Sequence, residues 1–85
     1  MPKVVIYTTS SCPYCIAAKR LLTQKGVTFE EISVDGDAVG RSKMAERAGA
    51  RRTVPQIFIG ESHIGGCDDL YTLEEAGRLD ALLAS

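Results

Sequence analysis

The chain has 85 residues, of which 45% are hydrophobic and 25% charged, as in folded globular proteins rather than disordered ones. The net charge of −1 argues against a nucleic-acid binder that relies on phosphate attraction, because such proteins carry an excess of basic residues. A basic cluster at positions 47, 51 and 52 is offset by acidic residues elsewhere. At this length we expect one domain, residues 1–85, with a single modest core.

The apolar run VVIYTT near the N-terminus is far too short for a secretory signal or a membrane span. We therefore expect a cytoplasmic protein with no membrane partner. The three cysteines are too few, and odd in number, for the disulfide scaffold of a small secreted protein. In a reducing compartment, a close cysteine pair is more often catalytic or metal-binding than structural.

The first half of the chain alternates strand and helix patterns. Residues 3–8 are rich in β-branched and aromatic side chains, which predicts a buried strand. A helix is predicted over 13–25, with Pro13 in its first turn and Gly26 at its exit. Apolar and polar residues alternate over 27–34, which predicts a second strand. Asp37 is then expected to cap a helix that runs to about Ala48 and stops at Gly49.

In the second half, Pro55 is followed by two short predicted strands around a turn at 60–62. Residues 67–85 are helical by their leucine spacing, with a break expected near Gly77. The predicted order is β-α-β-α-β-β-α, in which a parallel βαβ unit and a hairpin share one sheet. The fold class is therefore α/β, with a four-stranded mixed sheet flanked by helices.

Cys12 and Cys15 fall at the junction between the first predicted strand and the first predicted helix. Free N–H groups and the helix dipole favour negative charge there, and the thiolate is the nucleophilic form of cysteine. Three residues later, the Cys15 side chain returns toward Cys12 within the first helical turn. Pro13 stiffens that turn. The spacing predicts a pair that closes and reopens a small disulfide.

A metal site is the main alternative for these cysteines. Together with His63 and Cys67 they form C-x2-C…H-x3-C, which is enough ligands for tetrahedral zinc. However, 47 residues separate Cys15 from His63, far beyond the usual spacing of a zinc finger. His63 also falls in a predicted strand, where alternate residues face away from each other. We therefore expect no metal ligands in this chain and a surface position for His63.

Three segments of the sequence resemble the dithiol glutaredoxins of the thioredoxin superfamily, in particular the short bacterial ones. These segments are CPYC at 12–15, TVP at 53–55 and GGCDD at 65–69, and the resemblance spans essentially the whole chain. It implies a thioredoxin-like fold and a glutathione-dependent thiol–disulfide oxidoreductase with catalytic residues Cys12 and Cys15. It implies no bound cofactor, because glutathione is the co-substrate. The expected partners are glutathione and disulfide-bearing or glutathionylated proteins, with glutathione reductase acting indirectly, and the expected state is a monomer.

The resemblance also implies a glutathione site. Pro55 is expected to be cis, and Val54 to pair its backbone with the cysteinyl part of glutathione; from the sequence alone, Pro55 could equally begin an edge strand. Free amides at the start of the last helix suit a carboxylate, and an aspartate there suits an ammonium group. The two aspartates could also be ordinary helix-start residues. The other expected contacts are Tyr14 as a groove wall, Thr53, Gly66, Cys67, Asp68 and Asp69.

The chain departs from the family pattern at Thr9, where many members have a lysine that attracts the glycine carboxylate of glutathione. A threonine hydroxyl can donate one hydrogen bond there but carries no charge. Arg41, near the start of the second predicted helix, could take over the cationic role. It could equally be a solvated surface arginine.

Two other functions share parts of this pattern. A redoxin reduced by thioredoxin reductase has the same fold and C-x-x-C, but usually carries an aromatic- and arginine-containing signature where this chain has GGCDD. An iron–sulfur carrier would hold a 2Fe–2S cluster between Cys12 of two chains and two glutathiones. Relatives with that function tend to have Gly or Ser after the first cysteine, so Pro13 and Tyr14 weigh against it.

Overall fold

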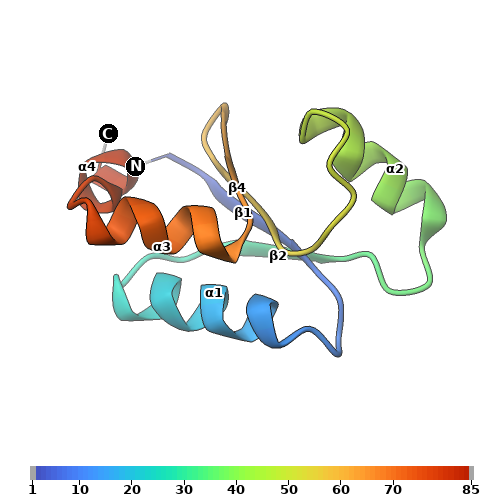
Figure 1. The fold of residues 1–85 in the computed structure, drawn as a ribbon, viewed down its shortest axis with the longest axis horizontal. Helices are drawn as coiled ribbons and strands as arrows, with labels where there is room; N and C mark the ends of the chain where they lie inside the picture. Colours follow the sequence, from blue (N-terminus) through green and yellow to red (C-terminus); the bar gives the residue numbers. More distant parts are fainter. Residues whose placement is uncertain (1, 85) are drawn as a thin grey trace.

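The computed structural model describes residues 2–84 and contains a four-stranded sheet in the order β2-β1-β3-β4, with helices on both faces (Figure 1). The chain runs through β1 (Val4–Thr8), α1 (Pro13–Gln24), β2 (Glu30–Ser33), α2 (Ala38–Arg47), β3 (Gln56–Ile59), β4 (Ser62–Gly65), α3 (Cys67–Glu75) and α4 (Leu79–Ala84). β1 is parallel to β2 and antiparallel to β3, and β3 and β4 form an antiparallel hairpin. The predicted mixed α/β sheet is confirmed. Within residues 2–84, no helix combines the length and the apolar character needed to cross a membrane.

β1 is buried on both faces because its alternate side chains enter two different cores. Val4 and Ile6 pack with side chains of α1, α3 and α4. Val5 and Tyr7 pack on the opposite face with Met44 of α2. Figure 1 accordingly shows α1 and α3 on one side of the sheet and α2 on the other. The loop that follows β1 therefore leaves a strand that is fixed from both sides.

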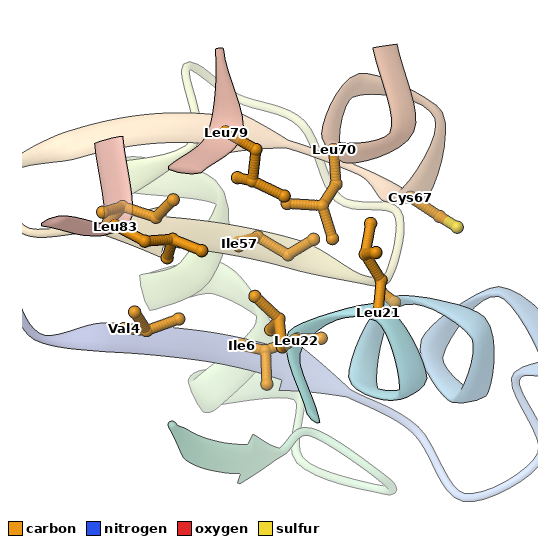
Figure 2. Packing of buried hydrophobic residues seen from close by; sticks show 11 residues of the cluster. Val4, Ile6, Leu21, Leu22, Ile57, Cys67, Leu70, Leu79 and Leu83 are labelled. Carbon is orange, nitrogen blue, oxygen red and sulfur yellow. The ribbon is translucent and has the colours of Figure 1, made fainter. Parts of the chain in front are cut away.

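The larger core lies between the sheet and three helices (Figure 2). Leu22 of α1, Leu70 of α3 and Leu79 of α4 are fully buried in it. Its members are Val4, Ile6, Ala18, Leu21, Leu22, Ile57, Ile59, Cys67, Leu70, Leu79 and Leu83. In Figure 2 the Cys67 sulfur points away from Leu70, toward the edge of this cluster. The core thus extends to the start of α3, which carries part of the candidate site.

Two element boundaries show how packing acts on the sequence pattern. The second strand begins at Glu30 rather than at position 27, and the apolar residues Val27 and Phe29 pack against the larger core from the segment before it. The helical stretch after Gly66 is divided, because Gly77 adopts φ +70 between α3 and α4. The break predicted near Gly77 is confirmed.

The start of α2 follows its capping signal. Asp37 Oδ1 accepts a hydrogen bond from the backbone N–H of Gly40 at 2.8 Å, as expected for an N-cap residue. The helix then continues to Arg47, with Ala48 as its C-cap. The predicted helix and its cap are confirmed.

Candidate active site

Cys12 caps α1, and its sulfur lies at the centre of the site. Its backbone is extended, with φ −108 and ψ 105, and Pro13 begins the helix directly after it. The backbone N–H of Cys15 donates to Cys12 Sγ at 3.1 Å, and the Cys12 thiol lies 3.7 Å from the carbonyl oxygen of Val54. An N–H directed at a sulfur interacts more strongly when that sulfur is charged. The local geometry therefore suits Cys12 to act as a thiolate nucleophile.

Cys15 has the opposite environment. Only 1% of its surface is exposed, and its thiol, like that of Cys12, is not in a disulfide. The pKa of Cys15 is raised to about 12, mainly by burial and then by a hydrogen bond with Cys12, while the backbone of Thr9 and the charge of Lys19 act to lower it. At neutral pH Cys15 is therefore a protonated thiol, held within the first turn of the helix that Cys12 caps.

A cavity of about 150 Å³ opens beside this pair. Its walls come from the first turn of α1, the loop before β3 and the first turn of α3. Tyr14 is 64% exposed at its rim, and the peptide bond between Val54 and Pro55 is cis, as the resemblance implied. The lining residues are Tyr14, Arg51, Thr53, Val54, Pro55, Gly66, Cys67, Asp68 and Asp69.

The start of α3 supplies the charged side of the cavity. Asp69 Oδ2 accepts from the backbone N–H of Gly66 at 2.8 Å and from Arg51 Nη1 at 3.2 Å. The hydrogen bond from Gly66 and, after it, the neighbouring Arg51 lower the pKa of Asp69. Gly65 makes this arrangement possible, because it has φ +116 and a Cβ at that position would meet the Asp69 carboxylate and lie 2.8 Å from Arg51 Nη1.

Cys67, the third thiol, lines the cavity but is not suited to attack. Burial raises its pKa, and the charges of Asp68 and Cys12 add to this effect. As a small buried residue it joins the start of α3 to the larger core.

A buried glutamine fixes the loop that precedes β3. Gln56 has no exposed surface, and its Nε2 donates to the carbonyl oxygen of Thr53 at 3.0 Å and to Thr53 Oγ1 at 3.2 Å. His63 Nε2 lies 2.6 Å from Gln56 Oε1, and the His63 ring packs on Phe58 with the ring centroids 5.0 Å apart. His63 thus lies on the exposed side of β4, where it supports the cavity wall through Gln56. Within residues 2–84, no three His, Cys, Asp or Glu side chains gather closely enough to hold a metal ion.

Most of the residues predicted to bind glutathione line this one cavity, but Thr9 and Arg41 do not. The guanidinium of Arg41 instead donates through Nε to the backbone carbonyl of Arg52 at 2.9 Å. Arg51 lines the cavity although no site role was predicted for it. Its signal in the sequence is the basic pair of Arg51 and Arg52 directly before TVP.

A second cavity, of about 400 Å³, lies between the residues around Lys3 and those around Thr28. It is larger than the cavity beside Cys12, but no cysteine, histidine or arginine lines it. Size alone therefore does not mark the site. The smaller cavity adjoins the Cys12 thiol at Val54, and its lining includes one arginine and two aspartates.

Comparison with known proteins gives a consistent result. The family model described as Glutaredoxin matches residues 4–64. A protein from Pseudomonas aeruginosa named glutaredoxin is 62% identical over 85 residues, covering 100% of both chains. The solution structure of glutaredoxin from Brucella melitensis superimposes with a TM-score of 0.86 at 55% identity, covering 98% of this chain and 89% of that one. The crystal structure of a buckwheat glutaredoxin–glutathione complex superimposes with a TM-score of 0.87 at 32% identity, covering 98% of this chain and 77% of that one.

The family match includes the cysteine pair, the cis proline, the first three strands and most of β4, and the observed sheet and helices agree with the solved structures. The chain has the thioredoxin-like fold, and it belongs to the glutaredoxin family of thiol–disulfide oxidoreductases.

Proposed function

We propose that this protein uses glutathione as its reductant and acts by two routes, on glutathione mixed disulfides through Cys12 alone and on protein disulfides through Cys12 and Cys15. The observation that carries the proposal is the cavity beside Cys12. Its wall combines a backbone segment at Val54, a cation at Arg51 and carboxylates at the start of α3. The buckwheat relative was solved as a complex with glutathione, which supports the same ligand here.

Glutathione has a group for each part of this wall. The Val54 backbone would pair with the cysteinyl part of glutathione, beside Thr53 and the ring of Tyr14. The free amides at the start of α3 would donate hydrogen bonds to the γ-glutamyl carboxylate. Because Asp69 is already bonded to Gly66 and Arg51, the more exposed Asp68 is our choice for the γ-glutamyl ammonium. Further contacts in this proposal are Pro55, Gly66 and Cys67, with Thr9 as a hydroxyl donor.

The glycine carboxylate of glutathione needs a cation, and two arginines are candidates. Arg51 lines the cavity and is 46% exposed despite its pairing with Asp69. Arg41, proposed from the sequence, donates a hydrogen bond to the backbone carbonyl of Arg52, the residue before Thr53 in the cavity wall. We favour Arg51 because its guanidinium already faces the site.

In the first route, the Cys12 thiolate attacks the glutathione sulfur of a mixed disulfide. The old S–S bond breaks, and the substrate leaves as a thiolate that takes up a proton. A glutathione thiolate then attacks the glutathione sulfur bound to Cys12. This step forms glutathione disulfide and regenerates the Cys12 thiolate, so no bound metal or organic cofactor is needed.

In the second route, Cys12 attacks a protein disulfide and remains linked to one of its sulfurs. Cys15 then loses its proton and attacks Cys12 Sγ, which releases the substrate thiol and leaves a Cys12–Cys15 disulfide. Two glutathiones reduce that disulfide to restore the pair. Thus the first route needs only Cys12, whereas the second needs both cysteines.

The test is the reduction of a small glutathione mixed disulfide, coupled to glutathione reductase. Wild type and Cys15→Ser should be active, and Cys12→Ser should be inactive. Protein disulfide reduction by glutathione should be lost in both variants. A wild-type chain that is inactive with glutathione but is reduced by thioredoxin reductase would overturn the proposal in favour of a thioredoxin-like redoxin. A purified protein with visible iron–sulfur absorption under anaerobic conditions would point instead to the cluster carrier.

A further inference from the structure

A lysine, a glutamate and a threonine from three elements form a small network beside the exchange pair. Glu31 of β2 accepts two hydrogen bonds on its Oε2 atom, from Lys19 Nζ at 3.0 Å and from Thr8 Oγ1 at 2.7 Å. Thr8, at the end of β1, is 2% exposed, so its hydroxyl is a fixed donor. Lys19 retains 31% of its side-chain exposure. The network therefore holds a partly buried ammonium group at one place on α1.

That place is one helical turn beyond Cys15. Residues four apart lie on the same face of a helix, so Lys19 and Cys15 are neighbours. The side chain of Lys19 could otherwise extend freely into solvent. Its ion pair with Glu31, which is in turn bonded to buried Thr8, limits this freedom.

The second step of the protein disulfide route depends on the ionisation of Cys15. In the resting protein, burial is the main cause of its raised pKa, and two further contributions come from Cys12. Once Cys12 is joined to a substrate, its sulfur is neutral and no longer acts as a negative neighbour. Burial still opposes ionisation of Cys15, while the Thr9 backbone and the Lys19 charge continue to favour it.

We propose that Lys19, held by Glu31 and Thr8, is a positioning residue for the resolving step, in which its charge stabilises the thiolate that forms on Cys15. The Cys15 proton goes to solvent, the Cys15 sulfur forms a bond to Cys12 Sγ, and the bond between Cys12 and the substrate sulfur breaks. The released substrate thiolate takes up a proton, so the step needs no further oxidant or reductant. The inference rests on the proposed two-route function, because it concerns only the route that uses Cys15.

The single-cysteine route supplies an internal control. Reduction of a small glutathione mixed disulfide does not require Cys15, so neutralising Lys19 should leave that rate unchanged. A general loss of folding or of glutathione binding would lower both rates. Under the proposal, loss of the Lys19 charge lowers only the rate of the resolving step.

The experiment uses the full chain with Cys67→Ser, so that two thiols remain, and glutathione disulfide as the probe. Cys12 attacks the probe, and Cys15 then displaces the bound glutathione. Acid quenching and mass measurement follow the mixed disulfide as it converts to the Cys12–Cys15 disulfide. We expect Lys19→Gln to slow this conversion about threefold at neutral pH, a limited effect because the charge is partly exposed. Lys19→Arg should restore most of the rate, and Lys43→Gln, which removes an exposed lysine of α2, should have no effect.

A second readout excludes a purely structural role. In chains with Cys12→Ser and Cys67→Ser, the pH dependence of iodoacetamide alkylation reports the ionisation of Cys15. Lys19→Gln should shift this profile to higher pH by about half a unit, and Lys19→Arg should not. Unchanged conversion rates and an unchanged alkylation profile would overturn the Lys19 proposal while leaving the proposed function in place. Failure of the proposed function would show itself separately, as a wild-type chain inactive in the coupled glutathione assay.

Discussion

The two cysteines of the exchange pair differ because one caps a helix and the other lies within its first turn. Cys12 receives a backbone N–H, and its thiol lies 3.7 Å from the carbonyl oxygen of Val54 in the cavity wall, whereas Cys15 is almost fully buried. Burial disfavours a thiolate on Cys15, which supports the proposed order, in which Cys12 attacks first and Cys15 resolves second. A spacing of three residues thus gives an ordered pair rather than two equivalent thiols.

Arg51 gives the sharpest prediction for a single residue. Arg51→Ala should raise the KM for glutathione about three- to tenfold, because it removes a charge-assisted hydrogen bond that is partly screened by solvent. Steady-state kinetics with varied glutathione concentration, coupled to glutathione reductase, would measure this change.

Arg41→Ala is the matched comparison for that measurement. An unchanged KM in Arg41→Ala, together with a raised KM in Arg51→Ala, would assign the cationic role to Arg51. The reverse pattern would return that role to Arg41, as first proposed from the sequence. A normal KM in both variants would show that neither arginine holds a carboxylate of glutathione.

Among the elements, α4 shows how a short C-terminal helix can belong to the main core. It covers only Leu79–Ala84 and follows the glycine that ends the preceding helical segment. Nevertheless, Leu79 is fully buried and Leu83 is 5% exposed, and both pack in the same cluster as β1 and α1 (Figure 2). α4 therefore contributes to the layer that also fixes the start of α3.

Leu79→Ala should lower the free energy of unfolding by about 2–5 kcal/mol, because it removes buried methyl groups and leaves a cavity. Val39→Ala on α2 is a suitable control, because Val39 is 67% exposed and its truncation should cost less than about 0.5 kcal/mol. Chemical denaturation of the two variants would compare them. Equal and small losses would mean that α4 is dispensable to the core.

At the scale of the whole molecule, stability should depend on pH through two paired carboxylates. Hydrogen bonds from Thr8 and then Lys19 lower the pKa of Glu31, and the Gly66 amide and then Arg51 lower that of Asp69. A carboxyl group with a lower pKa in the folded state adds stability above its unfolded pKa. That contribution is lost as the pH falls through the folded value.

The free energy of unfolding should therefore decrease as the pH falls below about 5. Each group should contribute less than about 1 kcal/mol, because Glu31 and Asp69 are 40% and 47% exposed and solvent screens their ion pairs. Urea denaturation between about pH 7 and pH 3 would measure how the free energy of unfolding changes with pH. The double variant Glu31→Gln with Asp69→Asn should weaken this pH dependence. If the double variant kept the pH dependence of the wild type, the acid-sensitive groups would be others than Glu31 and Asp69.

The sequence predicted the order of elements, the mixed sheet and the position of the cysteine pair at a helix start. These features depend on local patterns, such as the β-branched and aromatic run of β1, Pro13 in the first helical turn and the capping residue Asp37. The second strand was predicted three residues too early, since its alternating pattern continues into Val27 and Phe29. Those two side chains pack on the larger core instead, and tertiary packing of this kind leaves no separate local signal.

What the sequence by itself determined about this protein is its class and its chemistry. A C-x-x-C at a strand–helix junction requires only short-range geometry, and TVP and GGCDD carried the family resemblance. The tertiary structure alone decided which distant residues meet. It brings Val54 to Cys12, Arg51 to Asp69 and Lys19 to Glu31. These pairs are 42, 18 and 12 residues apart, and they meet because the two cores fix the strand ends and helix starts on which they lie.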